Sequence, residues 1–437
     1  MPECLYRLSI APELAEFRPE IEHVCGFLDS SYQVRRMQEA ERVLHYGPDA
    51  PRGAVTVPAA LFPSGMRVDA NGLHPSQNEL ARMASRPDGG IRPAASDGVD
   101  ASLRYDAIGL IFFMLSRLEE REHPSRDRYG RFPVTAALFQ PENGRLYPHA
   151  DRAARDLAAA LTGAPEPPLR TRYALKVTHD VDVLRGYHRP LEPLRNAAGD
   201  IVKRGRPIAA LRRLFAAYGR GEPWRSMRRL MYLSEQHGIQ SHFYFMGPSS
   251  DFMDSTYAMR WPKLMKQVST EIHRRGHVLG FHPGFHTYND AAEWRRQRDG
   301  AESIMGHLLR EGRHHVLRYD CAVTPRIWSD GGMALDCTLA YPEVVGFRSG
   351  TCRPHHAFDL VARRTLPLMQ ISTAAMEFGL FDRKYRDVTL EQALADSFWS
   401  AQLCREFGGT FVVLFHSGQA HAKLWKWYER VLQQATQ

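Results

Sequence analysis

The chain has 437 residues, of which 43% are hydrophobic and 10% aromatic, and its formal net charge at pH 7 is +8. This length and apolar content exclude a disordered or fibrous protein and leave room for two or three globular domains. The charge is unevenly distributed, because residues 185–229 contain twelve basic and three acidic side chains. That segment carries a net charge of +9 and the remainder of the chain −1, so the basic character is local.

The cysteines and the N-terminus predict a cytoplasmic protein. The six cysteines are Cys4, Cys25, Cys321, Cys337, Cys352 and Cys404, and they form neither a CxxC motif nor a zinc-finger spacing. Free thiols in a reducing compartment are the simplest account of this pattern. The first residues carry charges and lack an apolar signal region, and no stretch reaches the roughly 18 apolar residues of a membrane span.

A proline-rich stretch at residues 162–170 predicts a domain boundary, because three prolines in four positions are incompatible with a helix or a central strand. We expect a smaller N-terminal α+β accessory domain at residues 1–168. In it, the apolar block at residues 104–120 predicts a buried helix. No motif upstream of residue 170 suggests catalytic chemistry.

Downstream, residues 172–437 alternate short apolar runs with longer polar, helical stretches, which is typical of repeated βα units. The strand-like runs lie at residues 173–177, 241–246, 278–281, 315–317 and 411–415. Most are followed at once by a reactive polar side chain. In a (β/α) barrel the C-terminal ends of the parallel strands meet on one face, so these side chains are expected to form one site.

The first two such motifs predict a catalytic metal site. Asp180 and Asp182 point to the same side if the strand continues through them. His282 and His286 add two imidazoles, and a His/His/Asp set with an open fourth position is the ligand pattern of a catalytic zinc. Zinc is therefore the expected divalent metal, although nitrogen and oxygen ligands also accept cobalt and nickel.

The order of the motifs resembles the NodB-type polysaccharide deacetylase family of carbohydrate esterases. The matching segments are Thr178-His-Asp-Val-Asp182, His282-Pro-Gly-Phe-His286, Arg318 and Leu414-Phe-His416. The similarity covers residues 172–437. It is strongest to a cytoplasmic subgroup with HDVD in the first motif, a long insertion before the second, the GFRSGTC stretch at residues 346–352 and an N-terminal accessory domain. The resemblance implies a distorted (β/α) barrel.

The resemblance also implies roles for individual residues. Asp180 matches the general base, Arg318 the arginine that orients it, and His416 the acid that protonates the leaving amine. Asp182, His282 and His286 match the metal ligands.

Further candidates surround these matched residues. Asp336 and Glu377 are both candidates for supporting His416. Arg348 is a candidate for binding an anionic part of the substrate, because a guanidinium suits phosphate and carboxylate. Tyr319 is a candidate for lining the sugar pocket.

The implied function is metal-dependent removal of an N-acetyl group from an amino sugar, nucleotide-linked or lipid-linked, in surface-polysaccharide or lipopolysaccharide biosynthesis. One alternative is an amide hydrolase or deformylase that acts on a non-sugar compound. Another is a catalytically silent carbohydrate-binding homologue. Two departures favour this last reading: Val181 separates the two aspartates, and Pro283 stands where the family has a hydroxyl residue.

The basic segment is an insertion of helical pattern around residues 185–230. Ile208, Leu211, Leu214, Phe215 and Tyr218 recur at helical spacing, which predicts a helix that packs one side and exposes arginines on the other. A solvated face is one interpretation of these arginines. A face that attracts a phosphorylated donor, a lipid pyrophosphate or an anionic membrane surface is the other. Nucleic acid is not expected, because the segment has few aromatic residues for stacking.

Overall fold

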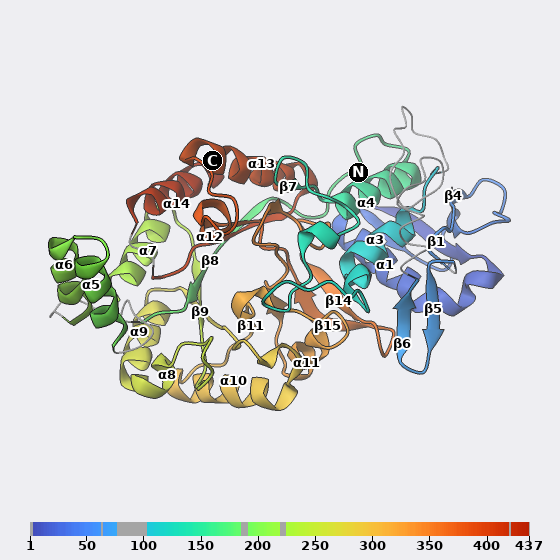
Figure 1. The fold of residues 1–437 in the computed structure, drawn as a ribbon. Coiled ribbons are helices and arrows are strands. Elements are labelled where there is room, and N and C mark those ends of the chain that lie inside the picture. Colours follow the sequence, from blue (N-terminus) through green and yellow to red (C-terminus); the bar gives the residue numbers. More distant parts are fainter. Residues whose placement is uncertain are drawn as a thin grey trace. The chain divides into compact units, whose positions relative to one another are not determined.

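The computed structural model describes residues 3–62, 64–76, 103–184, 191–218, 224–418 and 421–436, and at 192, 212, 213 and 215–218 it describes the backbone alone. The chain forms two compact units (Figure 1). Unit 1 consists of residues 1–174, 319–374 and 399–411, and unit 2 consists of residues 175–318, 375–398 and 412–437.

Unit 1 begins with a parallel sheet built on a βαβ unit. Its strands have the order β2-β1-β3-β4 and are all parallel. The elements in its first segment are β1 (Cys4–Ile10), α1 (Arg18–Ser31), β2 (Val34–Arg36), β3 (Arg42–Tyr46), β4 (Val55–Val57), β5 (Met66–Asp69), β6 (Gly72–Pro75), α3 (Ala107–Ser116), β7 (Arg145–Leu146) and α4 (His149–Thr162).

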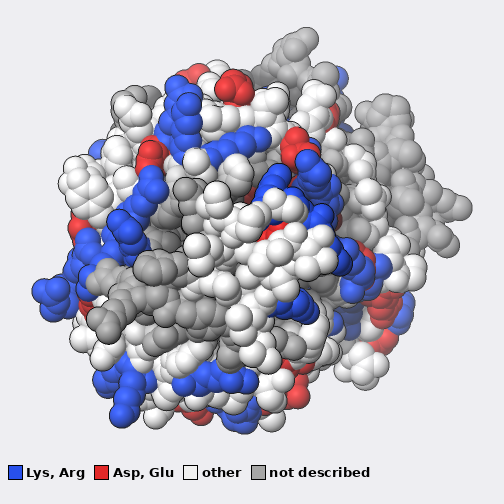
Figure 2. All heavy atoms as spheres, turned by 60° about the vertical axis from the view of Figure 1, so that its left-hand side comes forward, with Lys and Arg blue, Asp and Glu red and all other residues white. Residues whose placement is uncertain are grey.

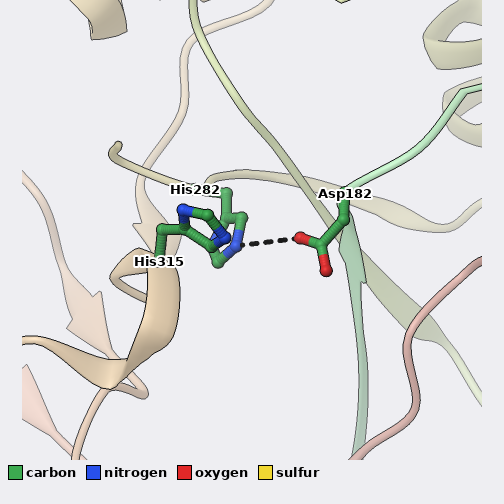
Figure 3. A group of neighbouring side chains, drawn as sticks. All are labelled: Asp182, His282 and His315. Carbon is green, nitrogen blue, oxygen red and sulfur yellow. Dashed lines mark ion pairs between the residues drawn. The ribbon is translucent and has the colours of Figure 1, made fainter. Parts of the chain in front are cut away.

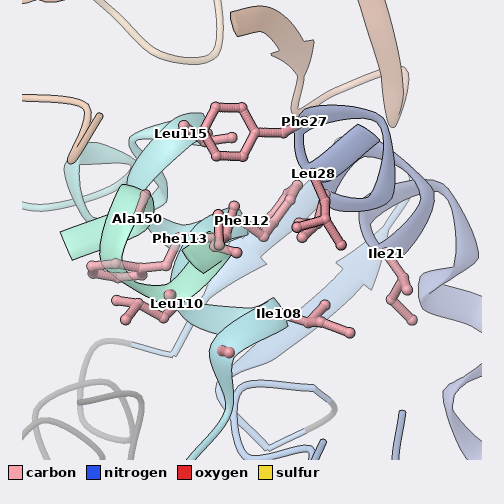
Figure 4. Close-up of a cluster of buried hydrophobic side chains, with 14 of the residues drawn as sticks. Ile21, Phe27, Leu28, Ile108, Leu110, Phe112, Phe113, Leu115 and Ala150 are labelled. Carbon is pink, nitrogen blue, oxygen red and sulfur yellow. The ribbon is translucent and has the colours of Figure 1, made fainter. Parts of the chain in front are cut away.

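The core of unit 1 is formed by α1, α3 and α4, whose apolar side chains meet in Figure 4. Every residue of α3 is buried, as the apolar block in the sequence predicts. Asp106 caps this helix by accepting a hydrogen bond from the Gly109 amide, and it also accepts one from the Tyr46 hydroxyl. A short aspartate at the helix N-terminus satisfies backbone donors that would otherwise be buried without partners.

The remainder of unit 1 comes from the C-terminal half of the chain. It contains α11 (Thr324–Asp330), β12 (Leu335–Asp336), β13 (Val345–Gly346), β14 (His355–Asp359) and β15 (Arg364–Gln370). β15 pairs parallel with β12 and antiparallel with β14. The sequence placed a single boundary near residue 170, whereas residues 319–374 and 399–411 belong to the same unit as the N-terminal segment.

Unit 2 has a mixed α/β architecture with largely parallel strands. The strand order is β11-β10-β9-β8-β17-β16, and β8, β9, β10 and β11 are parallel. Helices α7, α9, α10 and α14 lie around the outside of these strands (Figure 1). The strands are β8 (Ala174–Val181), β9 (Ser241–Phe245), β10 (Val278–Phe281), β11 (Glu311–Gly312), β16 (Ala375–Met376) and β17 (Thr410–Leu414). The helices are α5 (Glu192–Val202), α6 (Pro207–Tyr218), α7 (Arg225–Gln236), α8 (Tyr257–Arg260), α9 (Pro262–Arg274), α10 (Ala291–Met305), α12 (Glu377–Phe381), α13 (Leu390–Phe407) and α14 (Ala422–Ala435). The second half of α13 and the first two residues of β17 belong to unit 1.

Four of the five strand-like runs are confirmed, as β8, β9, β10 and β17. The prediction of a strand at residues 315–317 is wrong. These residues form a 3-10 turn in which Val316 and Leu317 both have φ of 59°. The strand lies just upstream, at β11, so the polar residue that follows it is Arg313 and not Arg318.

All six cysteines are free thiols, and five of them are buried. Within the described part of the chain, no helix has both the length and the apolar character needed to cross a membrane.

Candidate metal centre and active site

Strand β8 positions the two aspartates. Thr178 and Asp180 lie two residues apart on this strand, and residues 177–181 are buried, so the side chains on either face of the strand are sheltered from water. The carboxylate of Asp180 is 4% exposed and that of Asp182 is 21% exposed. Asp182 comes directly after the strand ends, which lets its carboxylate reach the histidines that follow the neighbouring strands.

Asp182 lies beside two imidazoles, those of His282 and His315 (Figure 3). One ligand atom from each of the three residues lies within 4.8 Å of the others. His282 Nε2 is 3.4 Å from Asp182 Oδ1, and the two imidazole rings are 5.2 Å apart and nearly perpendicular. Asp182 Oδ1 is buried without a hydrogen-bond partner. A buried carboxylate oxygen facing two imidazole nitrogens matches the donor set of a catalytic His/His/Asp metal site.

The hydrogen bonds of the histidines aim their Nε2 atoms at this point. His282 Nδ1 is 2.6 Å from the carbonyl oxygen of Arg313, which only accepts, so Nδ1 carries the hydrogen. His315 Nδ1 is 2.8 Å from Asp254 Oδ1, which imposes the same tautomer. Both Nε2 lone pairs are therefore free to bind a cation, in the carboxylate–histidine and carbonyl–histidine arrangements that orient metal ligands.

Asp254 connects His315 to the loop after β10. Its side chain is 1% exposed and accepts hydrogen bonds from the amide of Phe285 and the hydroxyl of Ser249, each at 2.8 Å. Burial raises the pKa of Asp254, but His315 and the hydrogen bonds from Phe285 and Ser249 together lower it by more, so the group is held as a carboxylate.

The expected second histidine of the metal set, His286, is not part of this group. It stands at the start of the 3-10 turn Thr287–Asn289, its side chain is 66% exposed, and its Nε2 is 3.3 Å from Asp251. After β10 ends at Phe281, a turn at Phe285 and His286 leads into this 3-10 segment and carries the chain away from the strand end. His315, which the sequence pattern assigned to a strand, takes the third position.

The expected partner of Asp180, Arg318, also lies elsewhere. It donates to the carbonyl oxygen of Phe285 and stacks on the rings of Phe285 and Tyr288, 4.1 and 3.9 Å from their centroids. Arg313 contacts Asp180 instead, since its Nη1 donates to Asp180 Oδ1 at 2.7 Å and its Nη2 to Thr178 Oγ1 at 2.9 Å. Arg313 is completely buried, so the two bonds hold its guanidinium and the Asp180 carboxylate in one orientation.

His416 lies on the other side of Asp182, with its Nε2 3.8 Å from Asp182 Oδ2. Its Nδ1 is 2.7 Å from Glu377 Oε1, and its backbone amide donates to the same oxygen at 3.0 Å. Burial lowers the pKa of His416, but the carboxylates of Glu377, Asp182 and Asp180, with Glu377 contributing most, together raise it to about 9. Of the two carboxylates considered for this role, Glu377 is therefore the partner of His416. Asp336 bonds to Thr338 and Gln370 in unit 1.

Arg348 and Tyr319, the candidates for substrate binding, are buried in unit 1. Arg348 is 1% exposed and forms a two-pronged ion pair with Glu120, at 3.0 and 2.7 Å, while also donating to the carbonyl oxygen of Ala340. Tyr319 is 5% exposed and shares a hydrogen bond with Gln370. Neither side chain is placed to meet a ligand from solvent, and Arg348 has the contacts of a structural residue.

A second buried charged cluster lies nearer the start of the same strands. Lys176 Nζ is 3.1 Å from both carboxylate oxygens of Glu311, which also accepts from His242 and from the hydroxyl of Tyr244. Burial raises the pKa of Glu311, but the hydrogen bond from His242 and the Lys176 ammonium lower it to about 2.

Comparison with known proteins gives two kinds of similarity. A family model described as "Family of unknown function (DUF7033)" matches residues 21–164, which lie in unit 1. No curated protein matches the chain.

The solved structures to which the chain is similar include a presumed polysaccharide deacetylase from Mycobacterium smegmatis, with 17% identity, a TM-score of 0.40 and coverage of 61% of this chain and 84% of that one. The catalytic domain of a peptidoglycan N-acetylglucosamine deacetylase from Eubacterium rectale matches at 12% identity with a TM-score of 0.31, over 61% of this chain and 84% of that one. A CE4 family pseudoenzyme from Bacillus anthracis matches at 10% identity with a TM-score of 0.32, over 60% of each chain.

Proposed function

We propose that this protein is a metal-dependent hydrolase that removes the N-acetyl group from an amino sugar carried on a nucleotide or a lipid. The observation that carries the proposal is the grouping of Asp182, His282 and His315 between two further polar pairs, Asp180 with Arg313 and His416 with Glu377. A cation site between a candidate base and a candidate acid is the arrangement that amide hydrolysis requires.

Asp182, His282 and His315 would hold a divalent ion. The buried, unpartnered Asp182 Oδ1 and the two Nε2 atoms fit an ion of borderline hardness such as Zn²⁺, and cobalt or nickel accepts the same ligands. When bound, such an ion polarises the acetyl carbonyl and lowers the pKa of a water molecule.

The protein residues provide the proton transfers. Asp180 accepts a proton as the oxygen of water bonds to the carbonyl carbon, and Arg313 holds the carboxylate in place for this step. His416 donates a proton to the amide nitrogen as the carbon–nitrogen bond breaks, which releases acetate and the free amine. Glu377 fixes the His416 tautomer, so that its Nε2 faces the reacting group.

The test is mass spectrometry of nucleotide-linked and lipid-linked N-acetylhexosamines, and of small non-sugar amides, after incubation with the protein and Zn²⁺. We expect the loss of one acetyl group from a sugar substrate. Asp180→Asn and His416→Ala should each abolish turnover while metal content stays at the wild-type level. Asp251→Asn should serve as an active control, because Asp251 pairs with the exposed His286, which lies outside the group of Asp182, His282 and His315.

Two other outcomes would indicate a different function. Hydrolysis of small amides alone would indicate an amide hydrolase or deformylase. Sugar binding without acetate release, even with the metal bound, would indicate a silent homologue and overturn the proposal.

A further inference from the structure

The first two helices of the basic segment present apolar side chains to solvent. Helices α5 and α6 pack against each other as a hairpin in unit 2 (Figure 1). Six large aliphatic side chains in this hairpin are exposed to 49–82%: Leu191, Leu194, Ile201, Val202, Ile208 and Leu211. Packing of Ile208 and Leu211 was expected from their helical spacing, yet each is 68% exposed.

The exposed apolar face of α5 is continuous. Leu191, Leu194, Ala198 and Ile201 recur every three to four residues and share one side of the helix. The opposite side is buried and carries Ala197 and Asp200. A helix of a soluble protein normally directs its apolar side chains toward the core. An apolar face directed toward solvent, as on α5, therefore indicates a surface that a membrane or another molecule covers.

Basic side chains border this apolar face. Arg195, Lys203 and Arg206 are exposed, and Arg204 pairs at 2.6 Å with Asp200, which is 4% exposed. Among the described side chains of residues 191–218, Asp200 is the one carboxylate, so the exposed charge described on this hairpin is positive. In Figure 2, which brings this side of Figure 1 forward, more of the coloured surface is basic than acidic.

We propose that the α5–α6 hairpin is a docking surface for an anionic lipid bilayer, with Leu, Ile and Val side chains inserted below the headgroups and Arg and Lys side chains among them. Aliphatic residues flanked by lysine and arginine are typical of helices that lie in the membrane interface. Anionic headgroups complement the positive charge. Protein interfaces, by contrast, favour aromatic residues, whereas the large apolar side chains described as exposed on this hairpin are all aliphatic. Membrane docking by this hairpin does not depend on the proposed deacetylation, so the two proposals are tested separately.

The test is co-sedimentation of the full-length protein with vesicles of phosphatidylcholine and phosphatidylglycerol, compared with vesicles of phosphatidylcholine alone. Binding is expected to the anionic vesicles and to weaken with added salt. One variant replaces the aliphatic face with a helix-forming polar residue, by Leu194→Gln, Ile201→Gln, Ile208→Gln and Leu211→Gln together. A second variant removes charge, by Arg195→Gln, Lys203→Gln and Arg206→Gln together. Because all these side chains are exposed, both variants should retain the wild-type circular dichroism spectrum and melting curve.

Each set of substitutions should weaken partitioning by at least about a hundredfold, since an exposed basic residue contributes about fivefold and a buried aliphatic side chain more than about tenfold. The matched controls are Leu308→Gln, at a side chain that is 70% exposed outside the hairpin, and the triple variant Lys263→Gln, Arg274→Gln and Arg295→Gln at exposed positions in unit 2. Both controls should bind as the wild type does.

Three results would overturn the proposal. The first is a wild-type protein that stays in the supernatant with anionic vesicles. The second is an aliphatic-face variant that binds as well as the wild type, which would mean that attraction is by charge alone. The third is a dimer in solution that the aliphatic-face variant converts to a monomer, because the hairpin would then be covered by a second copy of the chain.

Discussion

Asp254 provides the sharpest test of how the metal site is assembled. The substitution Asp254→Asn keeps the shape of the side chain but removes the charge that orients His315 through a 2.8 Å hydrogen bond. The same oxygen accepts the amide of Phe285, so an asparagine can keep the loop in place while His315 loses its carboxylate partner.

The expected loss can be estimated from the role of such partners. Removing the carboxylate behind a metal-binding histidine typically weakens metal affinity by about 10–100-fold, or about 1.4–2.8 kcal/mol. Stability should fall as well, by about 1–2 kcal/mol, because buried hydrogen bonds to a charged carboxylate become hydrogen bonds to a neutral amide.

The measurement is titration of the metal-free protein with Zn²⁺ against a competing chelator, with chemical unfolding of the metal-free protein in parallel. Asp251→Asn is the matched control. Asp251 is the carboxylate beside His286, the histidine that the HxxxH spacing placed in the metal set. If Asp251→Asn weakened binding and Asp254→Asn did not, His286 would be the ligand and the assignment of His315 would be refuted.

Three further predictions follow from the buried charges. Glu311→Gln should destabilise the protein by about 3 kcal/mol at neutral pH, because Glu311 has a pKa of about 2 in place of 4.5. A carboxylate whose pKa is lower in the folded state stabilises the fold at pH values above its pKa in the unfolded chain. The difference in unfolding free energy between wild type and variant should therefore disappear as pH falls from about 5 to about 2, which denaturant titrations at several pH values measure. Arg348→Met should cost about 3–5 kcal/mol in unfolding free energy, since it leaves Glu120 buried with one partner fewer, without changing KM. Arg313→Lys should lower kcat at least about tenfold with little change in KM, because an ammonium cannot hold a carboxylate and a hydroxyl in a fixed fork.

Each of these has a result that contradicts it. If the difference in unfolding free energy between wild type and Glu311→Gln did not change with pH, the Glu311 carboxylate would not be the titrating group. A raised KM with unchanged stability for Arg348→Met would return Arg348 to the substrate-binding role suggested by sequence. A raised KM with unchanged kcat for Arg313→Lys would place that arginine on the substrate rather than on Asp180.

Part of the candidate site could be predicted from the sequence, and local backbone geometry explains the rest of the group that the structure brings together. Asp180, Asp182 and His282 were predictable because each lies at or just after the end of an apolar strand, where the alternation of side chains is regular. His416 was predictable for the same reason, after β17.

The replacement of His286 by His315 was not predictable from spacing. It depends on the turn after β10 and on the left-handed backbone at Val316 and Leu317, a conformation that a β-branched residue seldom adopts. The apolar pattern of those two residues indicated a strand, so the arginine of the third motif was sought five residues too late. Arg313, at the end of a two-residue strand, offered a weak signal because β11 is too short to show periodicity.

The first segment of unit 1 ends at residue 174, close to the proline-rich stretch, but the return of later segments to this unit was not predictable from the sequence. Proline content identifies a linker, but it does not reveal that a later part of the chain returns to complete the first unit. That return depends on strand pairing between β15 and its neighbours, which are far from residue 170 in the sequence.

The three-segment composition of unit 1 has a consequence for how the protein is made. Its last segment is residues 399–411, so a ribosome must translate residues 117–398 after α3 before that segment can emerge. Translation proceeds at about 5–20 residues per second, so the apolar surface of α1 and α3 stays without its contacts to the last segment of unit 1 for on the order of 20 seconds or more. We therefore expect nascent chains to need chaperone protection. Recombinant fragments cut at the proline-rich stretch should be insoluble, and yield should respond to expression temperature more than to codon choice near the start.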